Sequence, residues 1–253
     1  MAERFTGKTV LVTGASGGIG RHTALAFARG GASVVVAGRS IEPLTQTVKL
    51  IEADGGRATA IAADVTRSAD IAELVAQTAA AYGRLDIAVN NAGALTAAGP
   101  VGDIDEGQWS ELVAVNLTGV LVCMKHEIAQ MRRDGGGAIV NVSSVLGAHL
   151  RLAGLGGYIA TKAAVSALTR NAARDHIREG IRINAVSPGP ADTSMSYRPG
   201  ESRADRDARV RDQLPAGRVA TLDEIAAAIV YLASPEAAFV VGTDLVIDGG
   251  AAA

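Results

Sequence analysis

Short apolar runs alternate with longer amphipathic stretches along most of the chain. The apolar runs are rich in β-branched residues, and the run at residues 34–37 has no polar position on either face. A strand that is apolar on both faces is typical of a sheet covered by helices on both sides. Seven such runs predict strands at residues 9–13, 33–37, 59–62, 87–90, 138–142, 183–186 and 245–247.

The stretches between these runs carry apolar residues at helical spacing and are rich in alanine. They predict helices at residues 19–29, 41–53, 68–82, 108–132, 158–178 and 222–233. Alternation of strand and helix indicates a parallel sheet, and right-handed crossovers then give a doubly wound α/β fold of the Rossmann type. We expect a single domain over residues 1–253, with a mostly parallel seven-stranded sheet flanked by helices, because no repeat, linker or composition break divides the chain.

The segment 194–217 departs from this pattern. It is polar and rich in charges of both signs, and it follows the carboxyl end of a predicted strand. Ligands of doubly wound sheets bind outside those ends, so we expect a substrate lid here. A solvated helical excursion is the alternative, and residues 203–211 are interpreted as a solvated face rather than as an anion site.

Composition and charge narrow the classes of function. The 253 residues are 48% hydrophobic and 20% charged, which is typical of a globular protein and excludes a disordered chain. The net charge of −2 provides no basic field for nucleic acid. No run of 18 apolar residues indicates a membrane span, and residues 1–8 do not resemble a secretory signal. The single cysteine, Cys123, predicts neither a disulfide nor a metal site, and favours the cytoplasm.

A glycine-rich turn follows the first predicted strand and opens the first predicted helix. Glycine lets the chain turn tightly and lets backbone N–H groups approach a pyrophosphate at the positive end of the helix. Many turns need glycine, but the position of this one, at residues 13–20, is the one that the dinucleotide fingerprint requires. The residues expected to contact the coenzyme there are Gly14, Ser16, Gly18, Ile19 and Gly20.

The end of the second predicted strand bears on the choice of coenzyme. An acidic residue would bind the ribose 2′-hydroxyl of NAD there, but the chain has Gly38 followed by Arg39 and Ser40. A guanidinium can bind the 2′-phosphate of NADP through two parallel hydrogen bonds. We therefore expect NADP rather than NAD, with an ordinary surface arginine as the alternative. Asp64 and Val65, after the third strand, are expected to close over the adenine, unless Asp64 only caps a loop.

Two further motifs point to a family. Asn90-Asn91-Ala92-Gly93 ends the fourth predicted strand, and Tyr158-Ile159-Ala160-Thr161-Lys162 opens the fifth predicted helix after Ser143-Ser144. Together with the turn at residues 13–20, these motifs make the chain resemble the short-chain dehydrogenase/reductase family, in a form similar to 3-oxoacyl carrier-protein reductases. Tyr-x-x-x-Lys alone would fit any amphipathic helix; the ordered set of motifs is what makes the resemblance specific.

The resemblance implies a catalytic group made of Asn116, Ser144, Tyr158 and Lys162. Hydride transfer from a nicotinamide to a carbonyl makes an alkoxide, which needs a proton from a positioned acid. Tyr158 and Lys162 are four residues apart on one predicted helix, so their side chains share a face. The pKa of tyrosine is normally about 10, and we expect the nearby ammonium group to lower it.

The resemblance also implies a role for each of these residues. Lys162 would bind the nicotinamide ribose, and Ser144 would bind the substrate oxygen. Asn116 would kink its helix and hold a water that links Lys162 to solvent. Residues of a strand alternate between faces, so only one of two adjacent serines can face the substrate; Ser144 fits the family motif better than Ser143.

More coenzyme contacts are implied at the ends of later strands. Asn90 is expected to tie neighbouring strands together rather than to bind a ligand. The residues expected to contact the coenzyme are Asn91, Ala92, Gly93, Pro188, Gly189 and Thr193.

The substrate is left open by the sequence. His149, in the loop after Ser144, is a candidate substrate contact beside Ser144 and Tyr158, although a lone loop histidine is more often solvated. Cys123, Trp109 and Phe239 are interpreted as packing or interface residues.

Partners follow from the resemblance. In carrier-protein reductases a basic patch near Arg132 receives the carrier. Glu179 stands where a basic residue is common, so docking of an acyl-carrier protein is doubtful here. The resemblance implies a homotetramer built on the helices at residues 108–132 and 158–178 and on the carboxyl-terminal strand.

The function expected is therefore an NADP-dependent carbonyl reductase or alcohol dehydrogenase. A non-catalytic NADP-binding sensor or scaffold is the alternative, although such relatives usually lose the tyrosine or the lysine. A sugar-nucleotide epimerase or dehydratase is a third hypothesis, which the chain length and the glycine spacing disfavour.

Overall fold

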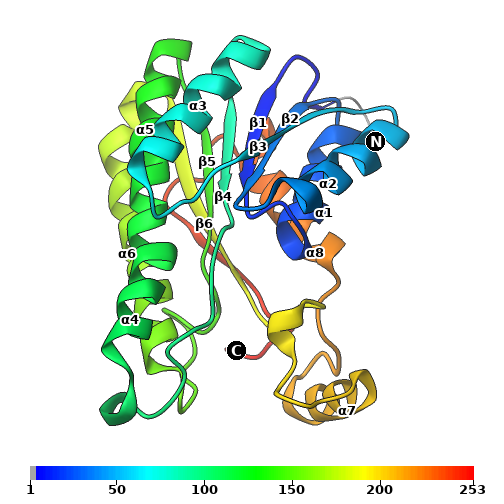
Figure 1. Ribbon diagram of the computed structural model, residues 1–253, viewed down its shortest axis with the longest axis vertical. Helices are drawn as coiled ribbons and strands as arrows, with labels where there is room; N and C mark the ends of the chain where they lie inside the picture. The colour runs from blue at the N-terminus through cyan, green and yellow to red at the C-terminus, as the bar shows by residue number, and fades with distance from the viewer. Residues whose placement is uncertain (1–3) are drawn as a thin grey trace.

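All seven strands of the sheet run parallel, in the order β3-β2-β1-β4-β5-β6-β7 (Figure 1). The computed structural model describes residues 4–253. Residues 1–3, which belong to the segment 1–8 compared with a secretory signal, lie outside the described residues. The strands are β1 (Thr9–Thr13), β2 (Ser33–Gly38), β3 (Arg57–Ala62), β4 (Ile87–Asn90), β5 (Gly137–Val142), β6 (Ile181–Pro188) and β7 (Asp244–Ile247). The predicted doubly wound fold is confirmed, and the sheet is parallel throughout.

Helices cover both faces of this sheet. One face carries α1 (Gly18–Arg29), α2 (Ile41–Ala53) and α8 (Leu222–Ala233), and the other carries α3 (Ser68–Tyr82), α5 (Gly119–Asp134) and α6 (Gly156–His176) (Figure 1). The shorter α4 (Glu106–Val113) precedes α5, and α7 (Arg203–Gln213) lies beyond the carboxyl ends of the strands. Short 3₁₀ turns occur at η1 (Val101–Asp103), η3 (Ile177–Glu179), η4 (Ser194–Ser196) and η5 (Pro235–Ala237).

The sheet separates two apolar cores. Val10 and Val12 of β1 pack beneath α1 and α8, whereas Leu11 between them packs with α3 and α5. β2 divides its side chains in the same way, with Val35 on the face opposite to its two neighbours. Each such side chain contributes roughly 1.5–3 kcal/mol when it leaves water. This two-sided burial explains why the run 34–37 is apolar at every position. Because the strands are parallel, their carboxyl ends lie along one edge of the sheet.

The predicted helix at residues 108–132 is in fact three pieces. α4 leads into one wide π-helical turn, η2 (Ala114–Thr118), which leads into α5, and α5 ends at Gly135 with a φ of 86°. The whole unit, Glu106–Asp134, is long and apolar enough to cross a membrane, as core helices of many water-soluble proteins are. Its apolar residues Leu112, Val120 and Met131 are buried in the fold, which identifies it as a core helix.

The segment 194–217 contains η4 and α7. Helix α7 begins with a reciprocal pair of bonds: Ser202 Oγ accepts from Asp205 N–H, and the Asp205 carboxylate accepts from Ser202 N–H. The segment follows β6 and lies over the carboxyl edge of the sheet (Figure 1). This position agrees with a lid, and its helix agrees with the alternative of a helical excursion. Closure over a substrate stays a prediction.

Candidate active site

The glycine-rich turn is held in place by Asn91, from the end of β4. Asn91 Nδ2 donates to the carbonyl oxygens of Thr13 at 3.1 Å and Gly14 at 3.2 Å. Gly14 has a φ of +65°, and a Cβ there would lie 2.8 Å from that nitrogen; a Cβ on Gly20 would lie 2.6 Å from it. Both positions therefore require glycine, because a Cβ would meet backbone as well as the Asn91 amide: Ala92 Cα at 2.9 Å from Gly14, and the Gly14 carbonyl oxygen from Gly20.

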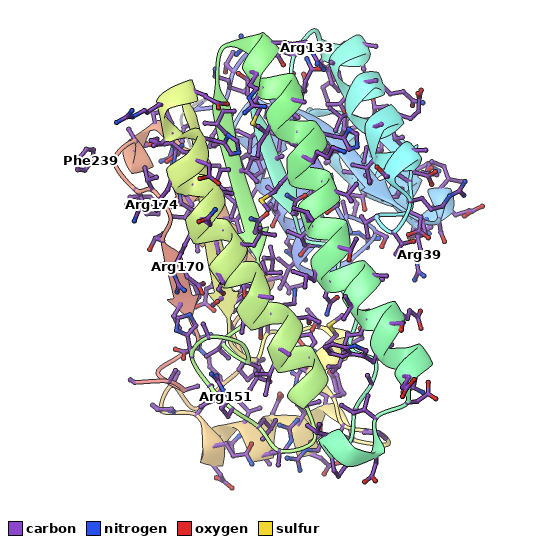
Figure 2. The ribbon with its side chains drawn as sticks, turned by 90° about the vertical axis from the view of Figure 1, so that its left-hand side faces the viewer. Arg39, Arg133, Arg151, Arg170, Arg174 and Phe239 are labelled. Carbon is purple, nitrogen blue, oxygen red and sulfur yellow. The ribbon has the colours of Figure 1, made fainter. Side chains whose placement is uncertain are left out.

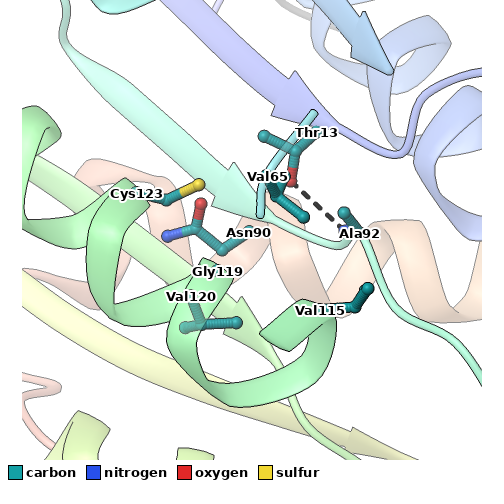
Figure 3. A pocket seen from close by; sticks show the side chains of 8 residues that line it. All are labelled: Thr13, Val65, Asn90, Ala92, Val115, Gly119, Val120 and Cys123. Carbon is teal, nitrogen blue, oxygen red and sulfur yellow. Dashed lines mark hydrogen bonds between the residues drawn. The ribbon is translucent and has the colours of Figure 1, made fainter. Parts of the chain in front are cut away.

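Thr13 joins β1 to β4 at the same edge. Its Oγ1 accepts hydrogen bonds from Asn91 N–H at 3.1 Å and from Ala92 N–H at 3.2 Å, the second of which is drawn in Figure 3. A Cβ on Gly119 would lie 3.0 Å from Val65 Cγ2, so α5 approaches Val65 closely. The result is a small pocket at the carboxyl ends of β1 and β4, with Ala92 in its wall (Figure 3).

The amino terminus of α1 has the features of an anion site. Within the described chain no side chain caps it, and its first turn has no acidic residue. Its first N–H groups and the positive end of its dipole are therefore available to a phosphate. A Cβ on Gly18 would lie 3.5 Å from Thr193 Cγ2, so Thr193 reaches this turn from beyond β6. Ser16 and Ile19 are half-buried beside it. These residues fit the pyrophosphate of a dinucleotide.

Arg39 and Asp64 lie at the ends of β2 and β3. Arg39 is exposed and forms no ion pair or hydrogen bond with another of residues 4–253, and Figure 2 shows it at the margin of the molecule. Asp64 Oδ1 accepts from Thr66 N–H at 2.9 Å and from Thr66 Oγ1 at 2.8 Å. These bonds, with the charge of Arg39, lower the pKa of Asp64. Asp64 thus caps the loop after β3, as one of the two alternatives predicted; contact with an adenine stays a prediction.

The predicted catalytic group adjoins the coenzyme site, because Lys162 lies close to the loop after β4. Lys162 is 3% exposed, its Nζ donates to the carbonyl of Val142 at 2.8 Å, and burial lowers its pKa to about 8. A Cβ on Gly93 would lie 3.5 Å from both Lys162 Nζ and Asn116 Oδ1. The loop at residues 91–93 therefore connects the glycine-rich turn to α6.

Tyr158 lies one turn before Lys162 on α6. Lys162 Nζ is 5.9 Å from the centre of the Tyr158 ring. Burial raises the pKa of Tyr158, and a hydrogen bond with the Ser144 side chain opposes that shift only in part. The prediction of a lowered pKa is therefore wrong for this chain on its own. The Lys162 ammonium is directed to a backbone carbonyl, while desolvation of the phenol dominates.

The two adjacent serines have different surroundings. Ser143 Oγ lies 2.9 Å from the carbonyl oxygen of Lys162 and 2.9 Å from Ser166 Oγ, inside the packing of α6 on the sheet. Ser144 Oγ accepts from Leu146 N–H at 3.1 Å and is the serine that reaches Tyr158. The structure therefore supports the choice of Ser144 as the catalytic serine.

Asn116 lies in the π-helical turn and is completely buried. Its Oδ1 accepts from Ala94 N–H at 2.8 Å, and its Nδ2 donates to Ala94 O at 2.9 Å and to Thr161 Oγ1 at 3.3 Å. The side chain thus ties the loop after β4 to α6. The water link to Lys162 stays a prediction.

The segments after β6 and β5 meet beside Ser144. Val145 N–H donates to the carbonyl of Pro188 at 2.9 Å. A Cβ on Gly189 would lie 2.6 Å from Asp248 Cα, so only glycine fits there. Pro188 and Gly189 are thereby fixed next to the loop that carries Ser144, which agrees with their expected contact with the coenzyme.

His149 has a different partner from the one expected. Its Nε2 lies 2.9 Å from Oδ2 of Asp244 in β7, whose side chain is buried and whose Oδ1 accepts from Ser187 Oγ at 2.6 Å. The side chain therefore ties the loop after β5 to the edge of the sheet. Contact of His149 with a substrate stays a prediction that this pairing does not favour.

Asn90 and Glu127 form a buried polar cluster beneath the coenzyme site. Asn90 Nδ2 donates to Asn141 Oδ1 at 3.0 Å, which confirms that Asn90 ties neighbouring strands, and to Glu127 Oε2 at 2.9 Å. Burial raises the pKa of Glu127 to about 7. Glu127 was not among the residues predicted from the sequence, although helical spacing places it on the same apolar face as Cys123 and Met131.

Arg132 is paired rather than free. Its Nε and Nη2 donate to the Glu179 carboxylate at 2.6 and 2.9 Å, and this holds the pKa of Glu179 near 2. Because Glu179 neutralises Arg132, the surface expected to receive an acyl-carrier protein loses one of its cations.

Comparison with known proteins adds to this geometry. The family model described as Enoyl-(Acyl carrier protein) reductase matches residues 14–252. The cis-4-hydroxycyclohexanecarboxylate dehydrogenase of Sinomonas cyclohexanicum is 42% identical, over 99% of this chain and 98% of its own. The cyclohexanol dehydrogenase of Acinetobacter sp. (strain SE19) is 35% identical, over 98% and 96%. The crystal structure of a short-chain type dehydrogenase/reductase from Mycobacterium marinum superposes with a TM-score of 0.91 at 33% identity, covering 98% of this chain and 97% of that one.

Proposed function

The chain belongs to the short-chain dehydrogenase/reductase family of oxidoreductases, and from this premise we propose that it interconverts a secondary alcohol and its carbonyl with NADP as coenzyme. The observation that carries the proposal is the placement of Ser144, Tyr158 and Lys162 at the end of the loop 91–93. The nicotinamide, when bound, supplies or accepts the hydride. The side chains supply the proton and the orientation of the substrate.

Tyr158 is the acid and base of this proposal. Its raised pKa keeps the phenol protonated at neutral pH, as a proton donor to a carbonyl oxygen must be. Ser144 would orient the same oxygen through its hydroxyl. Oxidation of an alcohol needs the phenolate, so it would be favoured at higher pH. Lys162, once its ammonium leaves the Val142 carbonyl, would bind the coenzyme ribose and lower the pKa of the phenol.

The preference for NADP is supported by Arg39. Its guanidinium is exposed, makes no bond with another residue of the described chain, and follows the strand whose end faces the adenosine ribose in this fold. Ser40 is exposed beside it and its hydroxyl does not cap α2. Both groups are therefore available to a 2′-phosphate.

We further propose an alicyclic alcohol as the substrate. The two curated relatives described above are both named for a hydroxyl on a cyclohexane ring. In this chain apolar side chains gather at the start of α6, just before Tyr158. A Cβ on Gly156 would lie 2.9 Å from Val101 Cγ2, and a Cβ on Gly157 would lie 3.5 Å from Trp109 Cε3. These side chains are suited to an apolar ring.

The experiment is coenzyme turnover with cyclohexanol and cyclohexanone, each tested with NADP(H) and NAD(H). Tyr158→Phe is expected to lower kcat by at least about 100-fold, the usual contribution of a positioned acid or base, while NADPH still binds. Tyr231→Phe, at an exposed position of α8, is the matched control. Arg39→Ala is expected to erode the preference for NADPH over NADH. Tight NADPH binding with no turnover of any carbonyl would instead support a sensor or scaffold.

A further inference from the structure

A cavity of about 370 Å³ lies between α7 and the segment 217–221 that leads into α8. Its volume is in the range of sites for small molecules. No residue expected to contact the coenzyme or the substrate directly lines it, although half of its lining comes from the segment 194–217, the predicted lid. Four of its lining residues are arginines, namely Arg203, Arg206, Arg211 and Arg218.

Arg206 forms the fixed base of this cavity. It is 1% exposed, its Nη1 lies 2.6 Å from Asp192 Oδ1, and its Nη2 lies 2.7 Å from Asp207 Oδ1. Its guanidinium also stacks on the Tyr197 ring, 4.6 Å from the ring centre. A buried arginine with bonds on both sides is rigid, so it holds the cavity wall in one arrangement.

The other arginines are not all compensated. Arg218 is paired with Glu224 at 2.7 Å. Arg203 reaches the carboxylates of Asp192 and Asp207 only at 3.5 and 3.9 Å, and both carboxylates already bind Arg206. Arg211 has no hydrogen bond or ion pair with any residue in 4–253. The cavity therefore presents one free guanidinium and one that is held weakly, beside the carboxylates of Asp192 and Asp207, whose charges are shared with Arg206.

We propose that this cavity binds a small molecule through a phosphate group, at a site separate from the coenzyme. Guanidinium groups match phosphate oxygens in pairs, so Arg203 and Arg211, which line the cavity from near the two ends of α7, can each bind phosphate oxygens of one ligand. The interpretation of residues 203–211 as only a solvated face does not account for the cavity beneath them or for the buried Arg206. Asp192 precedes Thr193 of the coenzyme site, so an occupied cavity would also steady that segment.

The test is calorimetric titration of the whole protein, saturated with NADP, with inorganic pyrophosphate at low ionic strength. We expect one saturable site per chain. Arg211→Gln and, separately, Arg203→Gln are each expected to weaken it about tenfold, as loss of one charge-assisted pair does. Arg174→Gln is the matched control, because Arg174 is an exposed arginine of α6 without a bonded partner in the described residues (Figure 2).

Two results would overturn the proposal. Weak binding that does not saturate, or that is equal in Arg211→Gln and Arg174→Gln, would mean an adventitious ion only. Binding that appears only without NADP, or that is lost in Arg39→Gln, would place the pyrophosphate in the coenzyme site. Melting temperatures of all variants show whether each is folded. If either Arg203→Gln or Arg211→Gln fails to fold, the other still tests the proposal. None of these readings depends on turnover, so the proposed function is tested apart from this site.

Discussion

At the scale of single residues, the site combines groups whose burial favours their neutral forms. Glu127 and Lys162 are almost fully buried, and each has a pKa shifted toward neutrality, to about 7 and about 8. Desolvation is the cause in both, because a charge loses the solvation of water on burial. Asn90 Oδ1, next to Glu127, is buried and lacks a donor among the described residues. A protonated Glu127 is suited to supply one.

The first prediction concerns Glu127 and pH. Its folded pKa is raised above the unfolded value, so its contribution to stability is complete below about pH 4.5 and is lost as pH rises through about 7. The loss amounts to at most about 3 kcal/mol in the free energy of unfolding. Glu127→Gln keeps an amide partner for Asn90 and should remove this slope. Urea unfolding at pH 5 and pH 8 measures it.

Glu52→Gln, at an exposed position of α2, is the control for Glu127 and should leave the slope unchanged. Equal pH dependence in the unmutated protein and in Glu127→Gln would show that the carboxyl is ionised throughout.

The second prediction separates the two serines. Ser143→Ala removes the bonds to Lys162 O and Ser166 Oγ and should lower the free energy of unfolding by about 1–2 kcal/mol. Ser144→Ala also loses two hydrogen bonds, from Leu146 N–H and with Tyr158, so its stability should fall by a similar amount. Only Ser144→Ala should lower kcat, by at least about tenfold, since it removes a hydrogen bond to the reacting oxygen. Unfolding curves and turnover of both variants provide the comparison. The opposite pattern would assign catalysis to Ser143.

At the scale of elements, the periodic pattern located all seven strands and most helices because their burial is local and regular. The strand ends were set too short where pairing continues past the apolar run: β6 extends to Pro188 because Pro188 pairs with Ile247. The glycine-rich turn and Tyr-x-x-x-Lys were predictable because their chemistry requires fixed spacing.

The family resemblance implied a kink at Asn116, but the pattern of apolar residues alone could not predict the interruption of the helix at Ala114–Thr118. It coincides with the bonds of Asn116 to Ala94, 22 residues away in the chain. A tertiary contact of this kind leaves no trace in the spacing of apolar residues. The pKa of Tyr158 was mispredicted for a related reason: spacing placed Lys162 near the phenol, but it did not reveal the bond from Lys162 to Val142.

The third prediction concerns α7. Arg206→Met keeps most of the side-chain volume but removes the bonds to Asp192 and Asp207, which leaves Asp192 with only the long contact to Arg203. We expect residues 192–213 to exchange backbone hydrogens at least about tenfold faster, which corresponds to about 1.4 kcal/mol of local stability. The KM for NADPH should rise because Thr193 follows Asp192. Hydrogen-exchange mass spectrometry measures the first effect and steady-state kinetics the second.

Arg174→Met is the matched change elsewhere on the surface and should alter neither quantity. Unchanged exchange in Arg206→Met would mean that the α7 cap and the bonds of Arg209 to Glu201 and Ser196 hold the segment without Arg206.

At the scale of the whole molecule, the sheet has two edge strands, β3 and β7. All four residues of β7 are half-buried. Phe239 and Val241 precede it and are 102% and 37% exposed. Figure 2 shows Phe239 projecting from the body of the molecule, beyond α6. A free strand edge next to a fully exposed aromatic ring favours association.

The fourth prediction is that copies of this chain assemble through that edge into the homotetramer that the family resemblance implied. Light scattering should give about 100 kDa, since one chain is 25.6 kDa. Phe239→Ser should lower that mass, because burial of a phenyl ring contributes roughly 1.5–3 kcal/mol and a symmetric assembly buries one per subunit. Leu50→Ser, at an exposed site on α2, should leave the mass unchanged. If the unmutated protein is a 25.6 kDa species at micromolar concentration, Phe239 has another partner or none, and the assembly is rejected.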